Sequence, residues 1–173
     1  MSECKTNDKV AIIVPYRDRD EHLRYFLNHL HPFLQRQQLD YQIYVVEQLG
    51  HGLWNKGILF NVGFKYVQET SKNYWNCYIF HDVDHIPDTD YNLYACPAQG
   101  PRHMSLRLDK FEYKRSYGPN YFGGSFAISP EHYQLINGFS NEFWGWGYED
   151  DDIRDRVLNK KLTIERYSPD IGR

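Results

Sequence analysis

Residues 10–34, VAIIVPYRDRDEHLRYFLNHLHPFL, decide the class of the fold. They open with the apolar run Val10–Val14, which stops at Pro15 and has the length of a buried strand that enters a loop. Apolar side chains then recur at helical spacing behind Asp20 and Glu21, the acidic residues expected in a first helical turn. A strand followed at once by an amphipathic helix is the repeating unit of an α/β domain.

The alternation of strand and helix continues along the chain and predicts an α/β domain with a largely parallel sheet. Pro32 should kink or end the first helix, because its ring removes a backbone donor. The further elements expected are a strand at Tyr41–Glu47, a helix at 56–69, strands at Cys77–His81, Met104–Leu108 and Gly124–Ile128, helices at Pro130–Ile136 and Glu149–Lys160, and a strand at Leu162–Tyr167.

Length and composition indicate one globular domain: 173 residues and 20.7 kDa, of which 41% are hydrophobic. A net charge of −3 gives no electrostatic footprint for nucleic acid. No apolar stretch approaches the ~20 residues of a membrane span, and the first residues lack the apolar core of a signal peptide. Cys77 and Cys96 could form a disulfide that leaves Cys4 unpaired, or all three could be reduced thiols.

Two polar clusters directly follow predicted strands, and ligands of parallel sheets bind at that edge. Asp82 and Asp84 are two residues apart, so their carboxylates face the same side of an extended chain. Such hard donors suit Mg²⁺ or Mn²⁺, which complete their coordination from substrate phosphates. The alternative is a turn with local side-chain bonds. His81 and His85 could be ligands, or could face solvent or support the site from behind.

The other cluster, Pro15–Arg19, holds two arginines whose guanidinium forks recognise phosphate or carboxylate. In the alternative interpretation both arginines pair with neighbouring acids of the same loop. Trp54-Asn55-Lys56 adds an aromatic ring, an amide and a cation that could hold a base and a phosphate. The chain has neither a P-loop nor a dinucleotide fingerprint.

The segment Trp144–Asp152, WGWGYEDDD, combines two tryptophans with four consecutive carboxylates. Aromatic faces cover the apolar faces of a sugar, and carboxylates accept hydrogen bonds from hydroxyls or remove a proton from one. Four adjacent acids also repel each other, so a fold that keeps them uses or neutralises them. The alternative is a helix start, where acids favour the positive end of the macrodipole.

Together these motifs resemble the β-1,4-galactosyltransferases of the Golgi, over nearly the whole chain from about Cys4 to Arg173. The resemblance implies a GT-A fold with a mixed, largely parallel sheet, and makes residues 1–173 part of a single catalytic domain. It implies transfer of galactose from UDP-galactose to the 4-hydroxyl of a terminal N-acetylglucosamine, with inversion and Mn²⁺. The stretches that carry it are VAIIVPYRDRDEHL, LHPFLQRQQLDY, FNVGF, HDVDHIP, YFGGSFAIS and NGFSNEFWGWGYEDDDI.

The resemblance also assigns roles to single residues. The donor nucleotide would be held by Pro15, Tyr16, Arg17, Asp18, Arg19, Trp54, Asn55 and Lys56, next to Asp82, Val83 and Asp84 of the DVD motif, with Asp84 as the metal ligand. Trp146 would lie between donor and acceptor, and Tyr121 accompanies galactose rather than N-acetylgalactosamine as the donor sugar. The acceptor would be lined by Tyr148, Glu149, Asp150 and Asp151, with Asp150 as the base. Cys77 and Cys96 match a family disulfide, and Cys4 matches half of another.

The chain departs from the family at three positions, where phenylalanine, arginine and glycine are usual in place of Tyr16, Lys56 and Tyr148. Lys56 keeps the charge but loses the fork, and a phenol at 148 could narrow or re-aim the acceptor pocket. The resemblance places two further metal ligands, a methionine and a histidine, beyond Arg173. It places the partner of Cys4, a stem and a type II membrane anchor before Met1, so that the longer protein would lie in the Golgi lumen.

Two alternatives stay open at this point. One is a relative that uses UDP-N-acetylgalactosamine, against which Tyr121 argues. The other is a catalytically silent module that binds a sugar or a nucleotide, because one carboxylate with substrate phosphates should hold Mn²⁺ weakly. A metal phosphodiesterase is disfavoured, since the sequence shows no second cluster of histidine and aspartate for a second metal.

Overall fold

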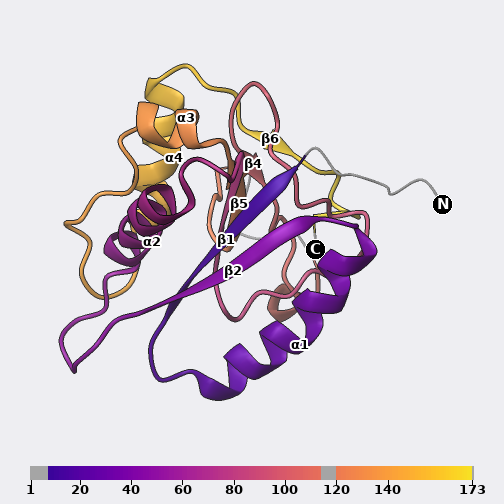
Figure 1. Ribbon diagram of the computed structural model, residues 1–173, viewed down its shortest axis with the longest axis horizontal. Coiled ribbons are helices and arrows are strands. Elements are labelled where there is room, and N and C mark those ends of the chain that lie inside the picture. The colour runs from indigo at the N-terminus through magenta and orange to yellow at the C-terminus, as the bar shows by residue number, and fades with distance from the viewer. Residues whose placement is uncertain (1–7, 114–119, 173) are drawn as a thin grey trace.

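The computed structural model describes residues 8–113 and 120–172 and shows a twisted sheet with helices on both faces (Figure 1). Its strands follow the order β2-β1-β3-β5-β4-β6. The first three are mutually parallel, β5 runs antiparallel to both β3 and β4, and β6 is parallel to β4. The bounds are β1 Lys9–Tyr16, β2 Asp40–Glu47, β3 Cys77–His81, β4 Arg102–His103, β5 Ser125–Ile128 and β6 Glu165–Arg166. The predicted mixed α/β fold is confirmed.

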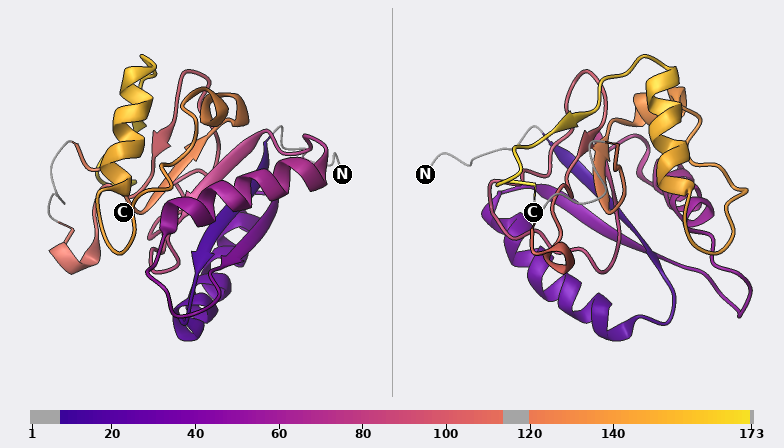
Figure 2. Two further views of the ribbon diagram at one scale, coloured as in Figure 1. Left: turned by 90° about the vertical axis from the view of Figure 1, so that its left-hand side faces the viewer. Right: turned by 180° about the vertical axis from the view of Figure 1, so that it is seen from behind.

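The helices divide between the two faces of the sheet. Helix α1 lies on one face, and α2, α3 and α4 lie on the other, as the two turned views make plain (Figure 2). The bounds are α1 Asp20–Arg36, α2 Lys56–Ser71, α3 Pro130–Leu135 and α4 Glu149–Asn159, with a short 3₁₀ turn at Asp109–Phe111. Among the described residues, no helix is both long and apolar enough to cross a membrane.

Strand β1 is central and buried, and its side chains pack alternately into two separate cores. Val10, Ile12 and Val14 pack with α1, while Ala11 and Ile13 pack with the helices of the opposite face. Burial on both faces explains why the sequence of β1 is continuously apolar rather than alternating.

Helix α1 continues for four residues beyond Pro32, so of the two expected outcomes, a kink or an end, the end is excluded. Pro32 lies on the exposed side of the helix, where the carbonyl that it leaves unpaired is open to water. Phe33 and Leu34, which follow it, are buried in the core with exposures of 1% and 0%. Packing of these two side chains outweighs the lost hydrogen bond.

Two predicted strands were misplaced or too long. Residues 104–108 are not a strand; the short strand β4 precedes them at Arg102–His103. The last strand spans only Glu165–Arg166 rather than Leu162–Tyr167. Both segments hold apolar residues because they cover the core as irregular chain, so local hydrophobicity gave no measure of strand pairing.

The Cys77–Cys96 pair forms a disulfide, with a Cα–Cα distance of 5.3 Å. It ties buried β3 to the segment that runs toward β4, and so fixes the connection that follows Asp82 and Asp84. Cys4 lies outside the described residues.

Helix α2 approaches the sheet most closely at Gly63. A Cβ there would lie 2.6 Å from Ile13 Cγ2 and 2.9 Å from Val46 Cγ2. Both of these side chains are β-branched and have little freedom to move aside. The glycine of the FNVGF stretch is therefore a packing requirement.

We expect Gly63→Ala to destabilise the protein by about 1 kcal/mol. The free-energy cost of overpacking should exceed the gain from the higher helix propensity of alanine. Urea unfolding measures the change. Val62→Ala on the half-exposed neighbouring position is the control, with an expected change within about 0.5 kcal/mol. An equal or greater stability of Gly63→Ala would contradict the close packing of α2 on the sheet.

Candidate active site

The two polar clusters meet at one edge of the sheet, as their positions after strands predicted. Strands β1 and β3 are parallel neighbours, so the loop after Tyr16 and the turn after His81 lie side by side. Arg19 Nη1 lies 3.1 Å from Asp84 Oδ2, and both side chains are about half exposed. The site is thus assembled from segments that are 65 residues apart.

The first loop does not follow the interpretation in which its arginines pair with adjacent acids. Arg17 donates to the carbonyl of Gly52 at 2.7 Å, and its guanidinium lies 5.3 Å from the ring centroid of Trp54. Tyr16 donates its hydroxyl to Asp20 at the start of α1. The backbone between them turns at Asp18, which has φ 51°. Arg17 and Trp54 therefore form one cationic and aromatic surface.

The side chain of Asn55 has a structural role. Its side chain accepts a hydrogen bond from the backbone of Ile58 at 2.9 Å and caps α2, and it donates to the carbonyl of Asn141 at 2.9 Å. It is only 1% exposed. Asn55 thus fixes the start of α2 and with it the position of the next residue, Lys56.

Lys56 is the centre of the site. Its ammonium lies 2.8 Å from Glu149, 2.9 Å from Asp150 and 3.6 Å from Asp82, and its side chain is only 11% exposed. One buried cation therefore joins the turn after β3 to the start of α4. The sequence indicated a ligand-binding cation here, but not this bridge.

The environment shifts the pKa values of this cluster in ways that follow from burial and charge. Burial would lower the pKa of Lys56, but the charges of Asp82, Asp150 and Glu149 outweigh it and hold that pKa well above its usual range. Burial raises the pKa of Asp150 to about 6, against the opposing charge of Lys56. Because three carboxylates share one ammonium, the pairing does not fully offset the desolvation of Asp150.

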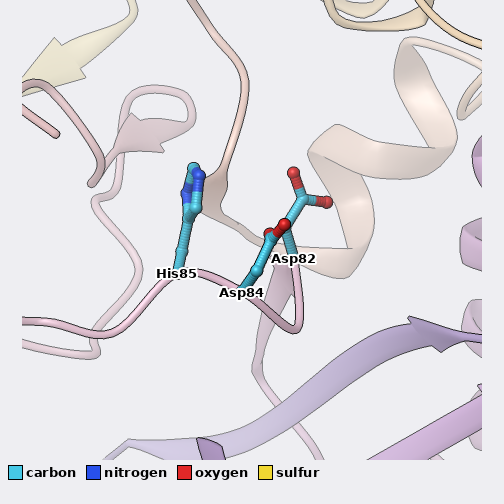
Figure 3. A group of neighbouring side chains, drawn as sticks. All are labelled: Asp82, Asp84 and His85. Atoms are coloured by element: carbon cyan, nitrogen blue, oxygen red, sulfur yellow. The ribbon is translucent and has the colours of Figure 1, made fainter. Parts of the chain in front are cut away.

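Asp82, Asp84 and His85 form a group that could hold a cation, with one potential ligand atom from each lying within 4.8 Å of the others (Figure 3). His85 Nδ1 is buried and has no hydrogen-bond partner among the described residues. Carboxylate oxygens and an imidazole nitrogen suit a divalent ion such as Mn²⁺. This donor set fits a metal, and it is larger than Asp84 alone.

His81 has a different role from His85. Its ring nitrogens bond the Tyr94 hydroxyl at 2.7 Å and the carbonyl of Asp82 at 2.9 Å. Burial lowers the pKa of His81 to about 4, so the ring is neutral at physiological pH. It supports the turn from behind.

A cavity of about 380 Å³ opens beside the acidic turn. Its lining includes Asp84 and His85 of the acidic turn and the cationic residues Arg107 and Lys110. This volume lies within the range of small-molecule sites. Sequence patterns did not indicate the cavity, because most of the residues that line it lie outside the helices and strands.

The four acids at the start of α4 have unequal surroundings. Asp151 pairs with Arg154 at 3.2 Å and Asp152 pairs with Arg156 at 2.6 Å, whereas Glu149 and Asp150 turn inward to Lys56. All four lie in the first turn of the helix. The segment is therefore a helix start, and at the same time it delivers two carboxylates to the site.

Gly123 brings Tyr121 and Asp150 together. A Cβ on Gly123 would lie 2.5 Å from Asp150 Oδ2 and 2.8 Å from the Tyr121 hydroxyl, so a side chain there would displace both. Tyr121 also packs against His103, with ring centroids 5.3 Å apart. The glycine pair before β5 thus has a role at the site that spacing alone did not reveal.

The aromatic residues of WGWGYEDDD project outward. Trp146 is 92% exposed and Tyr148 is 75% exposed. The backbone N–H of Gly145 donates to the carbonyl of Trp54 at 2.7 Å, which joins this segment to the loop that carries Lys56. The structure therefore brings the loop after β1, the Trp54–Lys56 segment, the DVD turn and the WGWGYEDDD segment together at one edge of the sheet.

Family models match almost the entire chain. The N-terminal region of glycosyl transferase group 7 matches residues 1–97, and the N-terminal domain of galactosyltransferase matches residues 102–173. The chain belongs to glycosyl transferase group 7. Of the curated relatives, β-1,4-galactosyltransferase 4 of Rattus norvegicus is 49% identical over 171 residues, which are 99% of this chain and 48% of that protein. β-1,4-Galactosyltransferase 3 of Homo sapiens is 48% identical over 98% of this chain and 42% of that protein.

Solved structures agree with this group 7 assignment. The catalytic domain of Drosophila β-1,4-galactosyltransferase 7, in complex with xylobiose, superposes with a TM-score of 0.82 at 36% identity, over 92% of this chain and 64% of that one. A variant of that enzyme, solved with manganese, UDP-Gal and xylobiose, gives the same TM-score at 34% identity. The group 7 chain described here spans about half the length of the curated relatives it matches.

We expect Lys56→Met to destabilise this group 7 chain by about 3 kcal/mol at pH 7, because buried carboxylates lose their cation. This loss of stability should be smaller at pH 5. Without Lys56 the pKa of Asp150 rises further above its unfolded value, so the folded variant gains a proton and stability as the pH falls.

Urea unfolding of the variant and the parent at both pH values measures this effect. Lys56→Arg, which keeps the charge, is the matched control and should lose far less stability. An equal loss for Lys56→Met at pH 7 and pH 5 would show that the carboxylates are not the cause.

Proposed function

We propose that residues 1–173 are part of the catalytic domain of an inverting galactosyltransferase. The enzyme would transfer galactose from UDP-galactose to the 4-hydroxyl of a terminal N-acetylglucosamine and form a β-1,4 linkage. The observation that carries the proposal is the bridge from Asp82 through Lys56 to Asp150. It places a candidate base beside a candidate metal turn, as direct displacement at a nucleotide sugar requires.

The donor side of the proposal rests on the loop after β1 and on the DVD turn. The Arg17 and Trp54 surface offers a cation and an aromatic ring for the nucleotide, and Arg19 lies beside Asp84. The remaining proposed donor contacts come from Pro15, Tyr16, Asp18, Lys56, Asp82, Val83, Tyr121 and Trp146. Asn55 would act on the donor side only by fixing the position of Lys56. A relative solved with UDP-Gal and manganese supports this assignment.

We assign the metal to Asp84, with Asp82 and His85 in reach of the same ion. Mn²⁺, when bound, would neutralise the charge that develops on the departing UDP. The buried, unpartnered Nδ1 of His85 is the feature of this chain that supports its inclusion. Arg19 beside Asp84 would orient that carboxylate and add positive charge at the diphosphate.

Asp150 is the proposed base. Its carboxylate would remove the proton from the acceptor 4-hydroxyl as the acceptor oxygen attacks the anomeric carbon, from the face opposite UDP. The bond to the diphosphate oxygen breaks with its electrons, so the configuration inverts and UDP leaves. A pKa of about 6 leaves Asp150 ionised at neutral pH and still able to accept a proton. Glu149, Asp151 and Tyr148 would flank the acceptor.

Family membership also supports a proposed acceptor and a proposed cellular location for the enzyme. We propose an N-acetylglucosamine-terminated glycan as acceptor, and residence of the longer protein in the Golgi lumen as a type II membrane protein. The relatives named above are β-1,4-galactosyltransferases, and the Drosophila enzyme was solved with a glycan, xylobiose.

Asp150→Asn should reduce transfer by at least a hundredfold, because general-base catalysis contributes about that much. UDP affinity, measured by calorimetry with Mn²⁺, should stay within about twofold. Asp84→Asn should lose Mn²⁺-dependent UDP binding and transfer together. Asp155→Asn, an exposed acid of the same helix, is the control and should behave as the parent. Near-normal transfer by Asp150→Asn would refute the assignment of the base.

The donor sugar is tested by comparing UDP-galactose with UDP-N-acetylgalactosamine in the same transfer assay. We expect a strong preference for UDP-galactose, because Tyr121 would restrict space beside the donor sugar. Tyr121→Leu should raise the relative rate with UDP-N-acetylgalactosamine. Turnover of UDP-N-acetylgalactosamine alone by the parent protein would overturn the proposed donor.

A further inference from the structure

Tyr148 adopts a backbone conformation that costs free energy for a residue with a Cβ. Its φ is 72°, in the left-handed region that a side chain with a Cβ disfavours. It is the N-cap of α4, yet its side chain makes no capping hydrogen bond. The caps of the other described helices, such as Asn55 and Ser129, have negative φ. A tyrosine here is therefore not explained by the helix that it begins.

The surroundings of Tyr148 form a short arch, residues 145–148, that is fixed at both ends. At one end the N–H of Gly145 donates to Trp54, and at the other Glu149 and Asp150 bind Lys56. Both glycines of this arch face open space, since a Cβ on Gly145 or Gly147 would meet no atom within 4 Å. The arch thus borders the proposed active site directly.

Two aromatic rings project from this arch. Trp146 and Tyr148 are 92% and 75% exposed, and neither ring has a partner among the described residues. Their Cα atoms are at most about 7 Å apart. Exposed rings held beside carboxylates offer stacking surfaces for neighbouring sugars of one glycan, with hydroxyl acceptors close by. A backbone outlier at such a site supports a functional role.

We propose that Tyr148 determines acceptor specificity: its ring contacts the second sugar residue of the acceptor and so favours oligosaccharides over a monosaccharide. This inference rests on the proposed function. Trp146 would serve the terminal sugar, and Tyr148 would extend the aromatic surface away from the base.

The test compares kcat/KM for the β-1,4-linked dimer of N-acetylglucosamine with kcat/KM for the monomer. In the parent protein the dimer should be preferred. Tyr148→Asn, Tyr148→Gly and Tyr148→Ala should each lower the ratio about fivefold, the value of one stacking contact. Tyr148→Phe should keep the ratio, and so should Tyr66→Asn, which removes an exposed tyrosine from α2.

Thermal unfolding distinguishes the effect of removing the ring from the effect of relieving the backbone conformation. Asparagine and glycine tolerate positive φ, so Tyr148→Asn and Tyr148→Gly should raise Tm by on the order of 3 °C. Tyr148→Ala and Tyr148→Phe should not. The acceptor ratio should follow the presence of the ring, and Tm should follow the backbone preference. A ratio that tracks Tm instead, or that stays the same in all four variants, would overturn the proposal.

Absence of transfer to either acceptor would count against the proposed function rather than against Tyr148. Saturation-transfer NMR with the dimer then decides the role of the ring. Signals that weaken in Tyr148→Asn and persist in Tyr148→Phe would support a glycan contact. Equal signals in the parent and both variants would refute it.

Discussion

The buried ammonium of Lys56 holds the site together. Its three carboxylate partners come from the turn after β3 and from the start of α4, so one ammonium connects two separate segments of the chain. A buried charge is costly unless it is paired, so the pairing specifies where α4 begins relative to the sheet. The cap at Asn55, the tight packing at Gly63 and the approach permitted by Gly123 all serve to place the same cluster.

This arrangement connects the fold with the proposed chemistry. The central parallel strands bring two segments to one edge of the sheet: the Pro15–Arg19 loop after β1 and the DVD turn after β3. A nucleotide and a metal would bind there. Helix α4 contributes Asp150, which lies 2.9 Å from the ammonium of Lys56. Because desolvation keeps the pKa of Asp150 near neutrality, the carboxylate suits proton removal from a sugar hydroxyl.

Sequence reasoning predicted the elements that depend on local pattern. The apolar run of β1, the helical spacing of α1 and the acidic start of α4 each reflect forces that act within a few residues, and all three are confirmed. The failures concern tertiary packing. Pro32 is tolerated because the buried side chains beyond it hold the helix. Strand β4 pairs with β5 and with β6, and both partners come from later parts of the chain.

The site likewise has features that the sequence predicted and features that depend on tertiary structure. Motifs identified its residue types, but their partners could not be predicted, because the Lys56 bridge and the orphaned nitrogen of His85 exist only in three dimensions. Tyr148 was visible in the sequence as an unusual residue, whereas its left-handed backbone was not.

The central claim is that Asp150 shares a buried cation with two other acids and therefore stays partly desolvated. A ¹³C NMR titration of the side-chain carboxyl carbons tests it most directly, with the Asp150 signal assigned by its loss in Asp150→Asn. The account predicts a midpoint at about pH 6. A midpoint near 4, the value of an unperturbed aspartate, would contradict it.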